Sequence, residues 1–565
     1  MTIIKKRNPG GWLIFFTLLL VALLAPSRAI IENRPTKYSV LSPAENAAGL
    51  VHPKMQSALS RLEEIYLSSG PERAKDYARL RKMDMDGESI RVVTVTISSP
   101  NQLQSKMAVP LMKQRIEALG GKIELTYRNL VQTYIPIQAL EPLANEPFVK
   151  YVRLPLKPVA LEVVSEGVSK TGANKWKDIA PYRVTDEARV CILDIGFKGY
   201  TNLLGTELPS SVVARSFRGD NDIFADEVHG TANAEIVHDM APNAKLWLVN
   251  FETDVEHHQA VDWIISQGVQ VISYSLGWTN AGAGDGTGPI CYDVERAADN
   301  GIIWASSAGN AAQDHWEGTF NDPDGDGWHN FSGTDRYLEF HVPPNTLVDV
   351  GLNWNDWGTW TGYDYTGSNQ DFDLYLYHWT GSSWSFVDKS TSLQNGSQWP
   401  VEEIYGWYSG TAGTWAVSIS KKTSATKNVK LELFTGGNDE AIEYFVSAGS
   451  LVIPADAVSA LAVGATDWLD DSLHYYSSWG PTHDGRTKPD LTAPSGVSTA
   501  TYGQWGFWGT SASAPHVAGA CGLVKGNTPY SINQIKKLLE NRAIDLGEPG
   551  RDNKFGFGRL NLKQK

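Results

Sequence analysis

Residues 188–307 alternate short apolar runs with amphipathic helical segments, and this alternation constrains the fold more than any other feature of the sequence. Continuously apolar strands are typically buried on both faces, so the pattern predicts an α/β fold with a parallel sheet and helices on both faces. Functional groups in such sheets gather in loops beyond the carboxyl ends of the strands. Asp194, Ser275 and the loop after Ser307 lie at such ends. The apolar runs are 189–194, 245–250, 269–275 and 302–307, and the helical segments are 235–240, 256–267 and 289–300.

The alternation stops between about 316 and 435, where 10 of the 20 tryptophans and many short alternating segments occur. Such segments are typical of antiparallel strands, so we predict an antiparallel β-sandwich inserted into the α/β domain. The tryptophans either fill its core or form a face that binds sugar or protein. The α/β pattern returns with an apolar strand at 460–465 and helices at 513–524 and 532–541.

The N-terminus has the features of an export signal. A basic start at 5–7 precedes an apolar run at 12–25, and Ser27 and Ala29 supply the small residues that signal peptidase reads. The run is short for a membrane span, and no later stretch is long and apolar enough for one. We therefore expect a signal peptide at 1–29, a secreted or cell-surface protein, and no stable membrane span after cleavage. The alternative is an uncleaved membrane anchor.

Charge is unevenly distributed along the chain. Residues 1–164 carry 22 Lys and Arg against 14 Asp and Glu, whereas residues 165–565 carry 27 against 49. A basic first third and an acidic remainder attract each other. The overall charge of −14, without a basic patch or a phosphate loop, argues against a nucleic-acid partner.

Three segments contain residue types that together support nucleophilic catalysis: Asp194 at a strand end, His229 before a helix, and Ser511 at a helix start. A serine hydroxyl is a poor nucleophile at neutral pH and needs an imidazole as general base. The imidazole in turn needs a carboxylate that fixes its tautomer. Taken singly, each segment is more often structural, since Asp and Ser commonly cap helices. The octapeptide around Ser511 and the order Asp, His, Ser in one domain favour catalysis.

These three segments resemble the motifs of the subtilisin-like serine proteases (subtilases), which occur in this order. The resemblance implies Asp194, His229 and Ser511 as the catalytic triad of a serine endopeptidase. Asn310, in Ser306-Ser-Ala308-Gly309-Asn310, matches the family's oxyanion-hole residue. Ser275, Leu276 and Gly277 resemble the strand that pairs with extended substrate, and Ala308 and Gly309 complete the implied substrate-binding set. No organic cofactor is implied.

The resemblance covers about 170–315 and 436–562. Residues 90–154 read as a split β-α-β, ferredoxin-like unit and resemble the family's propeptide, which acts as intramolecular chaperone and inhibitor. The implied organisation is a propeptide at 30–165, the first part of the catalytic domain at 166–315, the inserted sandwich at 316–435, and the second part at 436–565. We expect the maturation cut between about 155 and 170. The sequence departs from the family at Trp278, which replaces a common Gly and is expected to crowd the pocket.

Asp322, Asp324 and Asp326 lie on alternate residues before Gly327 and match the first half of an EF-hand loop. The twelfth position is Gly333 instead of Glu, although Asp335 lies nearby. The loop is therefore either a calcium site or a plain polar turn. Zinc is not expected, because His257, His258 and His315 have no Cys or His partners at ligand spacing.

The sequence thus predicts a secreted serine endopeptidase that acts on protein or peptide substrates and is activated by removal of its own inhibitory propeptide. The alternative is a catalytically silent surface protein that binds glycan or protein through the tryptophan-rich sandwich.

Overall fold

A computed structural model describes residues 52–81, 83–97, 102–156, 159–160, 166–176 and 188–563, all within one compact unit. The predicted signal peptide at 1–29 lies outside these ranges, and the predicted cleavage region lies partly outside them. No helix within the described ranges is long and apolar enough to cross a bilayer.

The central α/β part contains a seven-stranded, all-parallel sheet, as the apolar runs predict. Strands β7 and β9 are apolar and largely buried, which is why their sequences are continuous hydrophobic runs. In spatial order the strands are β22 (Leu491–Ser495), β21 (Ala460–Asp467), β12 (Ile303–Ser307), β10 (Val271–Tyr274), β7 (Arg189–Asp194), β9 (Lys245–Asn250) and β8 (Val213–Ser216).

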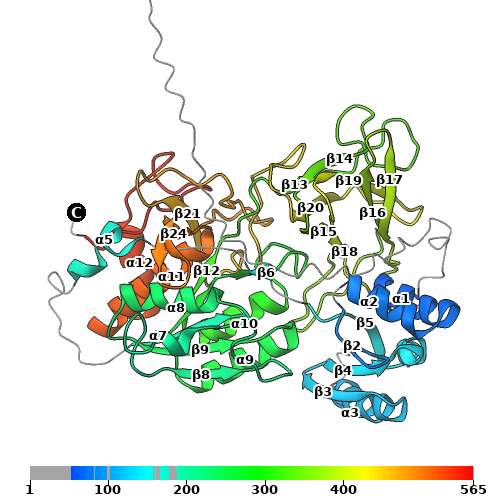
Figure 1. The fold of residues 1–565 in the computed structure, drawn as a ribbon, viewed down its shortest axis with the longest axis horizontal. Coiled ribbons are helices and arrows are strands. Elements are labelled where there is room, and N and C mark those ends of the chain that lie inside the picture. The colour runs from blue at the N-terminus through cyan, green and yellow to red at the C-terminus, as the bar shows by residue number, and fades with distance from the viewer. Residues whose placement is uncertain are drawn as a thin grey trace, which may run out of the picture. The chain divides into compact units, whose positions relative to one another are not determined.

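Helices cover both faces of this sheet (Figure 1). One core cluster joins alternate strand residues to α8 (His229–Met240), α11 (Thr510–Asn527) and α12 (Ile532–Arg542). The other joins the opposite face to α9 (Asp254–Ser266) and α10 (Pro289–Asp299). Helices α8 and α11 approach closely at Gly519, where an added Cβ would lie 2.4 Å from Met240 Cβ. Smaller elements are α5 (Val168–Thr171), η3 (Ala173–Lys175), α7 (Tyr200–Leu203), β11 (Leu276–Gly277), β23 (Val497–Thr499) and β24 (Gly503–Phe507).

Two four-stranded antiparallel sheets lie in the chain between β12 and β21, which are neighbours in the parallel sheet. They share one hydrophobic core and so form a β-sandwich, yellow-green in Figure 1. Trp316, Trp354 and Trp415 are at most 6% exposed and belong to this core, so these rings fill the interior of the domain. One sheet contains β13 (His315–Thr319), β20 (Lys430–Gly436), β15 (Leu347–Trp354) and β18 (Val401–Tyr408); the other contains β14 (Leu338–Val342), β19 (Gly413–Lys421), β16 (Phe372–Trp379) and β17 (Trp384–Ser390).

The N-terminal unit, residues 52–156, combines an antiparallel sheet with helices and is blue and cyan in Figure 1. Strand β2 is central and pairs with β1, β4 and β5. Residues 159–160 then form β6 (Val159–Ala160) beside β11. The unit contains α1 (Ser57–Ser69), α2 (Pro71–Leu80), β1 (Met85–Asp86), β2 (Ser89–Thr96), α3 (Gln102–Ala118), β3 (Lys122–Tyr127), β4 (Leu130–Pro136), η2 (Ile137–Ala139), α4 (Leu140–Ala144) and β5 (Val149–Arg153).

Candidate active site

The structure brings Asp194 and His229 into direct contact. Asp194 is the last residue of β7, and His229 is the first residue of α8. Nδ1 of His229 lies 2.8 Å from Asp194 Oδ1 and 3.0 Å from Oδ2, and both side chains are buried. The carboxylate also accepts a hydrogen bond from the Ile195 amide at 2.8 Å. A buried carboxylate in this position fixes the proton on Nδ1 and stabilises a charged imidazolium.

Asn233 connects this pair to the region of the serine. It lies one helical turn after His229 on α8, and its Nδ2 donates to Asp194 Oδ2 at 2.8 Å. Its Oδ1 accepts from the Ser275 hydroxyl at 3.2 Å, and the same hydroxyl lies 2.9 Å from the Ser511 carbonyl. Asn233 was not predicted from the sequence, because the helix was expected to begin only at residue 235 and its i+4 spacing from His229 was not recognised.

Ser511 is the second residue of α11 and is fully buried. Its Oγ donates to the carbonyl of Ser275 at 2.9 Å. The first turn of a helix presents unpaired N–H groups and a partial positive charge, which favour negative charge near the serine.

Asn310 lies in the loop after β12, and its side chain is held through the amide carbonyl oxygen. Oδ1 accepts from the Thr510 amide at 2.8 Å and from the Thr510 hydroxyl at 2.9 Å. Because a backbone N–H must donate to oxygen, these bonds fix the orientation of the side-chain amide. This orientation leaves Nδ2 as the donor end of the Asn310 side chain. Thr510, which holds Asn310, was also missed from the sequence.

The expected substrate strand pairs with a segment of the same chain. Leu276 and Gly277 form β11, which pairs antiparallel with β6: Leu276 lies opposite Ala160, and Gly277 opposite Val159. Addition of an extended segment to a strand edge is the geometry by which sheets recognise peptides. The segment on β11 follows the N-terminal unit directly.

The other predicted substrate-binding residues line the neighbouring backbone. The Ala308 carbonyl accepts from the Val452 amide at 3.0 Å, and the Gly309 amide donates to Thr510 Oγ1 at 3.1 Å. Val452 also packs against Gly277, where an added Cβ would lie 2.5 Å from Val452 Cγ2. Residues 451–453 therefore lie beside β11.

Trp278 does not crowd this region as expected. Its ring is 2% exposed and lies in the core cluster beneath the sheet, 6.2 Å from the Phe251 ring centroid. Its Nε1 donates to the Tyr274 hydroxyl at 2.6 Å. The large side chain is accommodated because it is directed into the core.

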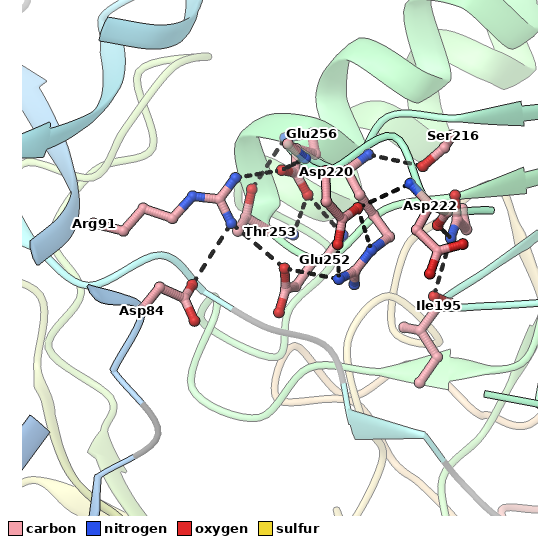
Figure 2. Close-up of polar contacts among 12 residues, drawn as sticks. Asp84, Arg91, Ile195, Ser216, Asp220, Asp222, Glu252, Thr253 and Glu256 are labelled. Atoms are coloured by element: carbon pink, nitrogen blue, oxygen red, sulfur yellow. Dashed lines mark hydrogen bonds and ion pairs between the residues drawn. The ribbon is translucent and has the colours of Figure 1, made fainter. Parts of the chain in front are cut away.

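Arg91 on β2 joins the N-terminal unit to the amino end of α9, as Figure 2 shows. Its guanidinium lies 2.7 Å from Glu256 and 3.5 Å from Glu252. Glu256 forms a capping box with Thr253 and also accepts from the Gly219 amide at 3.0 Å. Glu252 is 3.5 Å from Arg218. The N-terminal unit thus contacts both α9 and the loop that leads from β8 toward His229.

Among the residues that the structure describes, two clusters contain side chains of the kinds that bind metals. Carboxylate oxygens of Asp322, Asp324 and Asp326 lie within 4.8 Å of one another, and Asp322 also accepts from backbone amides of its own loop. Asp335 does not join them: its carboxylate accepts from the Tyr337 amide and the Tyr444 hydroxyl.

A second cluster lies in the core beneath the sheet. His257 Nδ1 and His258 Nδ1 lie 3.0 and 2.5 Å from Asp293, whose other oxygen binds Arg296 at 2.6 Å. The two histidines hold the pKa of Asp293 well below its usual range despite burial. The Arg296 charge makes this group an ion-pair network and disfavours a cation site.

A family model described as the subtilase family (Peptidase_S8) matches residues 213–330 and 378–558. The match includes His229, Asn310 and Ser511. It begins after Asp194, and its gap falls within the sandwich.

Among curated proteins, the chain is similar to Subtilisin Savinase of Lederbergia lenta, with 36% identity over 141 residues, which are 25% of this chain and 47% of that protein. It is also 31% identical over 204 residues to Alkaline elastase YaB of Bacillus sp. (strain YaB), over 35% of this chain and 49% of that protein. The chain spans less than half the length of these relatives. Among solved structures, the CspB protease of Clostridium perfringens aligns over 70% of this chain and 97% of that one, with a TM-score of 0.44 and 17% identity.

Proposed function

This chain belongs to the subtilase family, and from that premise we propose that it is an exported serine endopeptidase, activated by removal of residues up to about 155–170. The observation that best supports this proposal is the buried Asp194–His229 pair, joined through Asn233 and Ser275 to Ser511 at a helix N-terminus. Family membership explains why these groups come from separate elements in the order Asp, His, Ser.

In the proposed reaction, Ser511 Oγ attacks the peptide carbonyl carbon while His229 takes its proton. Asp194 holds His229 in the productive tautomer and stabilises its positive charge. The Asn310 Nδ2 and the Ser511 backbone N–H donate to the developing oxyanion. His229 then returns the proton to the leaving amine, and water hydrolyses the acyl-enzyme by the same route in reverse.

We propose that the N-terminal unit is the inhibitory propeptide and that β11 receives the backbone of protein substrates. The pairing of β6 with β11 supports both ideas, because it places the chain's own extended segment where a substrate strand would add. Full burial of Ser511 in the uncut chain agrees with an inactive precursor.

We further propose that Asp322, Asp324 and Asp326 bind calcium, because three carboxylates before a glycine provide the oxygen ligands that this cation prefers. Bound calcium stabilises the folded state by mass action. Calcium added to the EDTA-treated Ser511→Ala protein should raise its melting temperature, and Asp324→Asn should abolish the rise. An equal melting temperature with calcium and with EDTA would leave the loop as a polar turn.

The central test compares wild type with Ser511→Ala. We expect only wild type to remove its own N-terminal segment, with the new N-terminus between about 155 and 170, and we expect the processed protein to react at Ser511 with a fluorophosphonate probe. Absence of labelling in a folded, processed protein would favour the alternative of a silent binding protein. Equal shortening of both chains would indicate that another protease makes the cut.

A further inference from the structure

The N-terminal unit contacts the inserted sandwich as well as the α/β part, and the strongest of these contacts are ion pairs of one polarity. Arg81 and Lys150 come from the N-terminal unit, and Asp388 and Asp364 come from the sandwich. This polarity agrees with the charge distribution of the chain, which is basic before residue 165 and acidic after it.

Arg81 directly follows α2, and its guanidinium forms an ion pair with Asp388 on β17. The two side chains are 7% and 11% exposed. The guanidinium also lies 5.4 Å from the Trp407 ring centroid and 4.9 Å from that of Tyr77, distances typical of cation–π contacts. The Asp388 carboxylate holds the pKa of Arg81 above its ordinary value in spite of burial.

Lys150 on β5 reaches a second site on the sandwich. Its Nζ lies 2.7 Å from Asp364 Oδ2 and 2.6 Å from the Tyr365 carbonyl oxygen. The side chains of Lys150 and Asp364 are 15% and 9% exposed. The ammonium group therefore exchanges water for two fixed oxygen acceptors of the sandwich.

The sandwich holds both carboxylates in place by itself. Trp407 Nε1 donates to Asp388 at 2.9 Å, and Trp399 Nε1 donates to Asp364 at 2.7 Å. These two tryptophans lie on and just before β18, so an indole N–H positions a carboxylate near each end of that strand. The sandwich therefore presents two preorganised anionic sites, which suit a folded basic unit.

Neutral hydrogen bonds add to the contact between the N-terminal unit and the sandwich. The Ser57 amide at the start of α1 donates to Ser392 Oγ at 3.3 Å, and the Ser57 and Ser390 hydroxyls lie 3.2 Å apart. Gln398 Nε2 donates to the Pro53 carbonyl. The sandwich thus supplies an acceptor for the first turn of α1, which has no side-chain cap of its own.

The unit is held separately on the side of the α/β part. Arg91 binds Glu256 (Figure 2), and Arg153 forms an ion pair with Asp254. Two sets of contacts on one rigid unit act as a bivalent attachment, in which release of either set leaves the other to restore it.

We propose that the inserted sandwich is a second receptor for the N-terminal unit, which retains this unit after the chain is cut and so delays the appearance of activity. The inference rests on the proposed function, because it assumes that the cut occurs. The cut removes the covalent link near β6 but leaves the contacts of Arg81 and Lys150 intact. The delay between cutting and full activity is then set by dissociation of the unit from the sandwich.

The test uses full-length precursors with Arg81→Met, Lys150→Met or both. These positions lie in the segment that leaves, so the released enzyme is identical to wild type and its final kcat/KM on a short peptide is unchanged. Arg115→Met is the matched control, because Arg115 binds only Glu146 of its own unit among the described residues. We expect each variant to shorten the lag after cutting by about tenfold or more, because loss of one partner of a buried charge pair acts mainly on the dissociation rate.

Size-exclusion chromatography provides the second readout. The cut wild-type unit and the Arg115→Met control should co-elute with the remainder of the chain, whereas the double variant should elute separately. If a change at Arg81 prevents folding, Asp388→Asn and Asp364→Asn test the same contacts from the sandwich side, with Asp439→Asn as control. Asp439 pairs with His341 on the sandwich and has no contact with the N-terminal unit among the described residues.

The outcomes separate the two proposals. Precursors that are neither cut nor active against peptide would contradict the proposed function. Precursors that are cut and become active, with the same lag in wild type and in the double variant, would overturn the role of the sandwich while leaving the protease intact.

Discussion

The side chain of Asn310 is held at its carbonyl oxygen, which leaves its amide nitrogen for the proposed oxyanion site. The Thr510 amide and hydroxyl both donate to its Oδ1, so Nδ2 points away from them without depending on substrate. Preorganised donors stabilise a transition state because they need no rearrangement when charge develops. Thr510 is therefore a positioning residue for the proposed oxyanion site.

Thr510→Val should lower kcat about tenfold with little change in KM. Removal of an oxyanion donor itself costs about 10² to 10³ in turnover, a magnitude known from a subtilisin. Thr510→Val removes only the hydroxyl and keeps the hydrogen bond from the backbone amide of residue 510 to Asn310 Oδ1, so its cost is smaller. Steady-state kinetics on a short peptide measure the effect. Thr171→Val is the control. It removes a buried hydroxyl that donates a hydrogen bond to the Val168 carbonyl, and it lies far from Thr510 in the sequence. An equal loss in both variants would indicate a general folding defect.

Glu235 is a buried carboxyl on α8 that accepts from the Ala500 amide at 2.6 Å and the Thr501 amide at 3.2 Å. Burial raises its pKa to about 7. A group with a raised folded-state pKa binds protons preferentially in the folded state. Its contribution to stability is complete below the unfolded pKa of 4.5 and is lost as the pH rises through 7.

Glu235→Gln removes this dependence, so the variant should gain stability relative to wild type between pH 5 and 8. The gain is at most about 3 kcal/mol, from 1.36 kcal/mol for each tenfold change in proton affinity. Thermal unfolding of both chains in the Ser511→Ala background measures it, and Glu548→Gln on the exposed C-terminal loop is the control. A difference that stays flat across this range would contradict the raised pKa.

At the scale of elements, the sequence predicted the parallel sheet and its helices because their periodicity reflects burial. The prediction located β7 and β9 correctly. Helix α8 was predicted only from residue 235, although it begins at His229. After His229 the residues of its first turns are small, and all of them are buried, so the amphipathic pattern used for prediction is missing there.

Strand β18 was missed for a different reason. Its inward face presents Glu402, Ile404 and Gly406, so an acidic residue lies where a hydrophobic one is expected. Glu402 is 1% exposed and accepts from Gln394 Nε2 at 2.9 Å, while burial raises its pKa well above its usual value. Tertiary contacts therefore override the local pattern.

Asn233 and Thr510 were not predicted as site residues because each acts through another side chain.

Strand β11 provides a prediction about close packing. An added Cβ at Gly277 would lie 2.5 Å from Val452 Cγ2 and 3.0 Å from Val452 Cβ. Gly277→Ala should therefore displace the strand edge and raise KM for peptides about tenfold, since 1.4 kcal/mol of lost binding corresponds to that factor. Adding Val452→Ala to Gly277→Ala should recover most of the affinity. No recovery would mean that Gly277 acts through something other than its contact with Val452.

At the scale of the whole molecule, an ion pair between the buried Glu432 and the more exposed His483 links the sandwich to the α/β part. Glu432 on β20 lies 3.2 Å from His483 Nε2 and 3.2 Å from His315 Nε2. The Glu432 carboxylate raises the pKa of His483 to about 9. A raised histidine pKa gives stability that is complete below 6.5 and lost as the pH rises through 9.

His483→Gln should lower the melting temperature of the Ser511→Ala protein below pH 7, and the difference from wild type should disappear by about pH 10. The loss of stability should appear mainly in the step of unfolding that separates the sandwich from the α/β part. His341→Gln serves as control, because His341 pairs with Asp439 within the sandwich. A difference that persists unchanged above pH 10 would show that the contribution of His483 is packing alone.

The sandwich separates β12 from its neighbour β21 by about 150 residues of chain. During synthesis at roughly 5 to 20 residues per second, the ribosome therefore needs roughly 8 to 30 s between completing one strand and the next. During that time β12 has no β21 to pair with, so this edge of the sheet stays open. Ser511 is translated later still. The proposed nucleophile is therefore translated only after almost all of the catalytic domain.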